Sequence, residues 1–153
     1  MITDQLKKVL KKNGIAINYD LDPDTTEQKQ TVILESFENE GYNNVNKKLI
    51  DFLMYFNDME LLFINEFKLP DSMHFKLDRA LKITYAIKTI EHDFDLKNII
   101  PFGMLHREHM ELIIDENDKV YATMDNILIH YGYDPFDALK NILNHNELDR
   151  IEI

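Results

Sequence analysis

The chain has 153 residues, a length at which one hydrophobic core is expected, so we assign residues 1–153 to a single domain. It contains no cysteine, which excludes disulfides, thiol nucleophiles and cysteine-ligated metal sites. With 17 Lys and Arg against 28 Asp and Glu, its formal net charge of −11 argues against direct binding to nucleic acid or to an anionic membrane.

The first residues lack the features of an export signal. Residues 1–8 contain no basic segment followed by an apolar run. No window of about 18 uncharged apolar residues occurs anywhere in the chain, so no membrane-spanning helix is expected. We therefore expect a cytoplasmic protein.

The N-terminal segment predicts a short helix over residues 2–13. Thr3 is its expected N-cap, and Asn13-Gly14 is a typical stop signal because glycine adopts the left-handed conformation at a helix end. Apolar and polar residues then alternate over residues 15–19. This alternation predicts a brief strand or an extended segment.

Two further helices are predicted after a turn at Pro23. The first runs over residues 25–40 and ends at Gly41, and Asn43 or Asn44 is the expected N-cap of the next. This next helix has one wide apolar stripe, which comprises Val45, Leu49, Phe52, Leu53 and Phe56. Such a stripe is typical of a helix that packs against the core.

The middle of the chain predicts one strand and one more helix. The apolar run at residues 61–64 fits the first strand of a sheet, and residues 69–72 are expected to form a loop. A fourth helix is predicted from Asp78, which is well placed as its N-cap. A strand over residues 83–87 is the alternative for part of this segment.

The next strand is predicted over residues 99–105, interrupted by Pro101 and bent at Gly103. Proline cannot donate a hydrogen bond to a neighbouring strand. We therefore expect Pro101 at an edge of the sheet or where a strand enters it.

The last third of the chain predicts hairpins and a closing helix. Strands are expected at residues 110–114, 120–122 and 127–129, with a hairpin loop at residues 115–118, and Asp134-Pro135 is a typical helix start. Together these elements predict an α+β fold. Its antiparallel meander is flanked by N-terminal helices and closed by a C-terminal helix.

Two segments have a superficial likeness to metal sites. His106 and His109 would share a face on a helix, but they lie between strands and form no His-Glu-x-x-His pattern. A structural zinc site would need two more ligands and a catalytic one at least a third, so a metal-dependent enzyme using these two histidines is the weaker alternative. Residues 115–119 resemble the start of a calcium loop, but Val120 stands where that loop needs glycine and Asn126 where it needs glutamate. We expect polar turns at both places and no bound metal.

No motif for catalysis is present. The two serines, Ser36 and Ser72, do not lie in a nucleophile elbow, and the four glycines are too scattered for a phosphate-binding loop. No pair of carboxylates lies in apolar surroundings that would divide acid and base roles between them. We predict a protein that is not an enzyme and that needs no cofactor.

The order of the elements resembles the SUKH superfamily, in particular its third immunity-protein subgroup, over about residues 30–145. Three stretches carry the likeness: a helix, a Gly41-Tyr42 turn and a second helix within residues 34–53; Pro101-Phe102-Gly103; and the hairpin and closing helix from Leu112 to Leu139. The resemblance implies a cytoplasmic immunity protein that binds a toxin domain of a bacterial polymorphic toxin system. The toxin would be a nuclease with a basic surface.

The resemblance leaves one alternative function open. Members of the same superfamily include regulatory or scaffold modules that bind a cellular protein and neutralise no toxin. Under the immunity hypothesis, exposed acidic residues are expected to contact the toxin. The predicted contact residues are Glu108, Glu111, Asp115, Glu116 and Asp118, with a second group of Glu38, Glu40, Asp93 and Asp95.

Overall fold

The computed structural model describes residues 2–153. The helices are α1 (Asp4–Lys12), α2 (Pro23–Glu38), α3 (Lys47–Phe56), α4 (Leu77–Ala80), the 3₁₀ helix η1 (Leu81–Ala86), α5 (Ile87–Phe94) and α6 (Pro135–Leu143). The strands are β1 (Glu60–Ile64), β2 (Pro70–His74), β3 (Ile100–Leu105), β4 (Met110–Ile114), β5 (Val120–Met124), β6 (Ile127–Gly132) and β7 (Asp149–Glu152).

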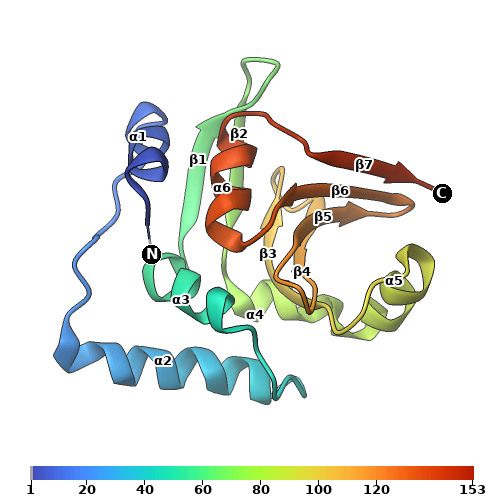
Figure 1. The fold of residues 1–153 in the computed structure, drawn as a ribbon, viewed down its shortest axis with the longest axis horizontal. Coiled ribbons are helices and arrows are strands. Elements are labelled where there is room, and N and C mark those ends of the chain that lie inside the picture. Colours follow the sequence, from blue (N-terminus) through green and yellow to red (C-terminus); the bar gives the residue numbers. More distant parts are fainter. Residues whose placement is uncertain (1) are drawn as a thin grey trace.

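The strands form one seven-stranded antiparallel sheet in the order β1-β2-β3-β4-β5-β6-β7, so each strand pairs only with its neighbours in sequence. Figure 1 shows α1, α2 and α3 at one end of this sheet and α6 lying across it. The predicted α+β meander with flanking helices is therefore confirmed. The exposed strand β7, which follows α6, was not predicted.

The N-terminal helices follow the expected capping chemistry in part. The Thr3 hydroxyl accepts a hydrogen bond from the Leu6 amide at 3.1 Å, as predicted. Helix α2 begins at Pro23 with Asp22 as N-cap, two residues before the predicted start, because proline is well tolerated at the first helical position. Residues 15–19 lie outside any helix or strand, so the strand alternative there is wrong.

The predicted cap of α3 is also wrong. The N-cap position is Asn46, and its side chain forms no capping hydrogen bond. Instead its amide group reaches across to the turn between β4 and β5. The Asn46 side chain therefore makes a tertiary contact with the β4–β5 turn and does not cap its own helix.

The loop predicted at residues 69–72 is wrong, because Pro70 begins strand β2. Pro70 lies opposite Ile64 at the outer end of the β1–β2 hairpin, where the missing proline N–H costs little. Asp71 in the same strand is buried. A charged residue is unusual in a buried strand, and the carboxylate of Asp71 is hydrogen-bonded to the ring of His106.

Residues 77–94 form three consecutive helical pieces instead of one helix. The N-cap position is Lys76 and not Asp78, which lies in the first turn of α4. The segment then tightens into η1 before α5 begins at Ile87. The alternative of a strand over residues 83–87 is therefore wrong.

Strand β3 shows the predicted interruption. The register of β3 against β4 shifts between Pro101 and Gly103, and β2 pairs with β3 only beyond this point. Pro101 therefore lies where no β2 residue needs its N–H, in agreement with the predicted strand-entry position. A Cβ atom at Gly103 would lie 2.5 Å from the carbonyl oxygen of His74, so glycine is needed where β2 and β3 converge.

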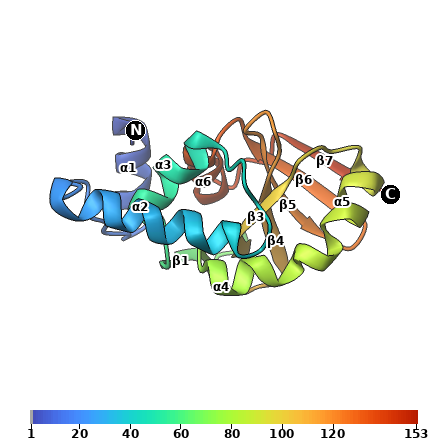
Figure 2. The same cartoon turned by 90° about the horizontal axis from the view of Figure 1, so that it is seen from below.

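The two faces of the sheet bury two different clusters. Leu112 and Ile114 of β4 belong to the larger core under α1, α2, α3 and α6, whereas Ile113 belongs to a smaller cluster beneath α5. Figure 2 shows α4 and α5 following one another along the sheet, with Leu77 of α4 in the larger core and Ile87 of α5 in the smaller cluster. Within residues 2–153, no helix combines the length and apolar character needed to cross a membrane.

Candidate functional site

The β4–β5 turn is built around the buried carboxylate of Asp115. This carboxylate accepts hydrogen bonds from the amides of Asn117 at 2.8 Å and Lys119 at 3.0 Å, and from the hydroxyl of Tyr121 at 3.2 Å. Burial raises the pKa of Tyr121 strongly, and the charge of Asp115 adds to this. Asp115 was a predicted contact residue, but it is only 6% exposed and stabilises the turn from inside the protein.

Two asparagines from other segments hold the outer part of this turn. The side-chain amide of Asn46 donates to the carbonyl of Asp115 and to the carboxylate of Asp118, both at 2.9 Å. The side-chain amide of Asn98 donates to the carboxylate of Glu116 at 2.7 Å. Asp118 is thereby fixed beside the start of α3, and Glu116 is fixed beside the start of β3.

Beside this turn lies a cavity of about 650 Å³ whose lining is strongly acidic. It is enclosed by the segment after α2, by η1 and α5, and by the β4–β5 turn. Its acidic lining residues are Glu40, Glu91, Glu116 and Asp118. Lys88 is the one lysine or arginine that lines it, and its ammonium group lies 3.5 Å from Glu91.

Tyr42 lies at the wall of this acidic cavity, and the pKa of its hydroxyl is affected by the charges there. Its hydroxyl donates to the Thr84 hydroxyl at 3.1 Å, which ties the segment after α2 to η1. Burial raises the pKa of Tyr42 most, the hydrogen bond with Thr84 opposes this, and the charges of Glu40 and Glu91 raise it further. The effect of Glu40 and Glu91 on this pKa agrees with the excess of carboxylates in the cavity lining, which favours positively charged groups.

The structure brings together only some of the predicted contact residues. Glu40, Glu116 and Asp118 line the acidic cavity although they came from two separate predicted groups. Asp93 and Asp95 lie at the C-terminal end of α5, where Asp95 caps the helix in the left-handed conformation. Residues Asp93, Asp95, Glu38, Glu108 and Glu111 do not line the cavity.

Glu108 and Glu111 lie near the β3–β4 turn. Glu108 contacts Nε2 of the buried His74 at 3.0 Å and the Arg79 guanidinium at 2.7 Å. Burial lowers the pKa of His74, against the opposing effect of Glu108. Burial also raises the pKa of Glu111 to about 7, and the nearby charge of Glu108 contributes. One oxygen of Glu111 is buried with no hydrogen-bond partner among the described residues.

The β3–β4 turn contains the two histidines considered for a metal. The ring of His106 is hydrogen-bonded through Nδ1 to the buried carboxylate of Asp71, which explains why that aspartate tolerates burial in β2. In the part of the chain that the structure describes, no group of three or more His, Asp or Glu side chains is arranged to hold a metal ion.

Sequence reasoning missed several residues of the acidic cavity, among them Glu91, Lys88 and Asn98. They come from α5 and from the segment before β3, which sequence does not link to the β4–β5 turn. The sequence feature that could have indicated this cavity is the Gly41-Tyr42 turn, which was named above only as part of a family resemblance. Gly41 has a φ of 90°, which glycine adopts readily, and it places Tyr42 at the cavity wall.

Comparison with protein families gives one informative match. The model of the family described as SUKH-3 immunity protein matches residues 3–145, nearly the whole chain. The match therefore extends the resemblance to the N-terminal helix α1. The comparisons with curated proteins and with solved structures gave no match.

Proposed function

The chain belongs to the SUKH-3 immunity protein family, and we propose that it binds and neutralises a cognate bacterial toxin domain, a nuclease with a basic surface. Family membership gives the coarser role, immunity against a toxin, and the match over residues 3–145 is the observation that carries it. The proposed action is binding alone, in the cytoplasm, without catalysis and without a cofactor.

Charge supports a basic partner. The chain carries a formal net charge of −11. A nuclease must hold phosphate groups and so presents cationic side chains at its active site. Opposite charges on two proteins raise their association rate by roughly ten- to a thousand-fold at low salt, and salt reduces this gain.

We assign the acidic cavity as the place where basic side chains of the toxin bind. Four carboxylates face one cavity there, and Glu116 and Asp118 are held in place by the amides of Asn98 and Asn46. Carboxylates fixed in advance lose little entropy when a partner arrives. Glu38, Asp93, Asp95, Glu108 and Glu111 lie outside the cavity and are not assigned to the contact surface, and Asp115 supports the turn from inside.

The test is co-expression with the toxin domain encoded beside this protein. The wild-type chain should relieve killing and should co-purify with the toxin. Unrelieved killing together with the absence of a complex would overturn the proposal, and a complex with an unrelated cellular protein would then favour the regulatory alternative.

A charge-reversal pair tests the assigned surface. Glu116→Lys changes the cavity lining, whereas Glu38→Lys makes the same charge change on the exposed end of α2. We expect Glu116→Lys to lower the association rate about ten-fold at low salt, more than Glu38→Lys, with the two converging as salt is raised. Equal rates for both variants at low salt would exclude the cavity as the contact site.

A further inference from the structure

The β1–β2 hairpin carries a surface that the acidic cavity does not explain. Strand β1 forms one end of the sheet and is hydrogen-bonded to β2 only. Figure 1 shows the hairpin extending beyond the rest of the sheet, with α1 beside the free side of β1. A free strand edge offers a row of backbone hydrogen-bonding groups to another strand.

The pairing pattern tells which backbone groups are free. The Asn65 amide donates to the Leu69 carbonyl, and the Phe75 amide donates to the Met59 carbonyl. Bonded and non-bonded pairs alternate in an antiparallel ladder, so the backbone groups of Leu62 and Ile64 point away from β2. Within residues 2–153, neither residue has a backbone hydrogen bond to any loop or helix on that side.

The same strand exposes apolar side chains. Leu61 and Phe63 face the core, whereas Leu62 is 69% exposed and Ile64 is 52% exposed. The hairpin loop adds Phe67 at 74% and Leu69 at 59%. Exposed apolar residues gathered on one hairpin are typical of an interaction surface, in contrast to single exposed ones.

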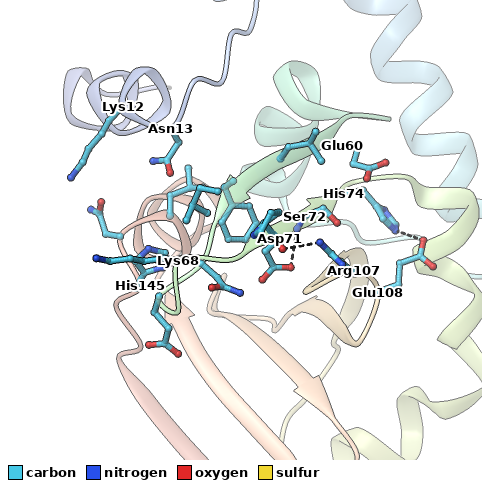
Figure 3. Close-up of a pocket in the computed structure, with 18 of the residues that line it drawn as sticks. Lys12, Asn13, Glu60, Lys68, Asp71, Ser72, His74, Arg107, Glu108 and His145 are labelled. Carbon is cyan, nitrogen blue, oxygen red and sulfur yellow. Dashed lines mark hydrogen bonds and ion pairs between the residues drawn. The ribbon is translucent and has the colours of Figure 1, made fainter.

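A hollow of about 1020 Å³ surrounds this hairpin, and its charges cancel. Four cationic side chains and four carboxylates line it. Figure 3 shows Lys12 of α1 and its C-cap residue Asn13 on one side of the hairpin, and His74 and Glu108 on the other. The formal charges of these eight side chains sum to zero in a chain whose net charge is −11, so this region favours a segment without net charge over a basic one.

The opposite edge of the sheet differs. Strand β7 has charged side chains at three of its four positions, and Arg150 pairs with Glu147 at 2.6 Å and with Glu152 at 3.7 Å. Charges along an edge strand discourage pairing with another chain. Strand β1 has one charged residue, Glu60, among its five, so it has less of this protection than β7.

We propose that the free edge of β1 binds an extended, mainly apolar segment of the toxin as an additional antiparallel strand. The added strand pairs with the backbone of Leu62 and Ile64, and its alternate side chains contact the exposed apolar residues of the hairpin. This assignment rests on the proposed function, since it names a part of the toxin. Figure 1 shows the hairpin and the β4–β5 turn in different parts of the molecule, so an extended arm is the toxin element suited to reach β1.

A single strand fits this edge better than a second copy of the chain. A second copy would bring its own α1 to the same side, where the first copy already has α1 beside β1 (Figures 1 and 2). Two chains with a charge of −11 each would also repel one another. A lone strand brings no second α1 to this side and carries no net charge of −11.

The test combines one substitution with amide hydrogen exchange. Leu62→Lys places a charge on the free edge, and Val32→Lys makes the same change on the exposed side of α2, where Val32 is 54% exposed. We expect Leu62→Lys to raise the dissociation rate of the toxin complex at least about ten-fold, with Val32→Lys close to wild type. In the wild-type complex, the amides of Leu62 and Ile64 should exchange more slowly than in the free protein.

The outcomes separate this inference from the proposed function. If the wild-type chain neither protects cells nor binds the toxin, the proposed function fails and this inference fails with it. If the wild type protects, but Leu62→Lys dissociates like Val32→Lys and the two amides exchange equally in free and bound protein, only the inference fails. If these amides become more protected in the free protein as its concentration is raised, the edge binds a second copy of the chain. That result would overturn the proposal that it binds a toxin segment.

Discussion

The two turns at the opposite ends of β4 are stabilised in opposite ways. The β3–β4 turn has three consecutive non-glycine residues, His106, Arg107 and Glu108, with φ between 53° and 69°. The β4–β5 turn needs only one such residue, Asp118, with a φ of 68°. Each left-handed non-glycine residue costs about 1–2 kcal/mol, so the first turn starts with a larger conformational cost.

The hydrogen-bond partners differ in the same way. In the β4–β5 turn, the carboxylate of Asp115 binds groups within six residues of itself. In the β3–β4 turn, the stabilising groups come from far along the chain: Asp71 binds His106, the Pro70 carbonyl accepts from Arg107, and His74 contacts Glu108. One turn is specified by its own sequence, whereas the other forms only when β2 is in place.

The largest effect is expected from Asp115→Ala, which removes the centre of the local turn. Two amides and the Tyr121 hydroxyl lose their acceptor inside the protein. We expect the free energy of unfolding, measured by urea denaturation, to fall by about 3 kcal/mol. Asp115→Asn keeps one acceptor oxygen and should lose about half as much; equal losses would show that the acceptor role is not what matters.

Asp71→Ala tests the long-range turn and should cost somewhat less. It removes the partner of His106 and an acceptor of the Ser72 amide at 2.8 Å. We expect a loss of about 2 kcal/mol in the free energy of unfolding. His106→Ala and the double variant complete a mutant cycle, in which additive losses would contradict a direct coupling between β2 and this turn.

Glu111, which follows the β3–β4 turn, predicts a pH dependence of stability. Its pKa is raised from 4.5 to about 7, chiefly by burial, so the folded state holds this proton more tightly than the unfolded state. The stability contributed by the protonated form is complete below pH 4.5 and is lost as the pH rises to about 7. Because the side chain is partly exposed, we expect about 1.5 kcal/mol.

The control for this prediction is Glu111→Gln, which cannot ionise. Unfolding curves at several pH values should show equal stability of variant and wild type at low pH, and a more stable variant at pH 8. A constant difference across this range would contradict the assignment of the pH dependence to Glu111.

The smallest effect is expected from Asn46→Ala, which removes the distant support of the local turn. Two hydrogen bonds to that turn are lost, but the Asp115 network remains. We expect a loss of about 1 kcal/mol, measured by urea denaturation, with Asn43→Ala as the matched control. A loss as large as that of Asp115→Ala would mean that the turn depends on α3 after all.

The two turns also show what could be predicted from the sequence. The β4–β5 hairpin, the Thr3 cap and the Asp134-Pro135 helix start were predicted because each depends on residues a few positions apart. Strand β2 was taken for a loop because Asp71 is compatible with burial only through His106, 35 positions away. The acidic cavity was missed as a unit for the same reason, since it joins Glu40 to Glu116 through the packing of α5 and η1.

The order of the sheet has a consequence for how the chain folds. Every strand pairs with its immediate neighbour in sequence, and four of these pairs are joined by short turns. The longer connections are the one from β2 to β3, which contains α4, η1 and α5, and the one from β6 to β7, which contains α6. The sheet can thus grow one strand at a time in chain order, while the packing of α1 against α6 is the contact that joins the two ends of the chain. Such local connectivity favours rapid folding, a useful property for a protein that must be ready before its toxin acts.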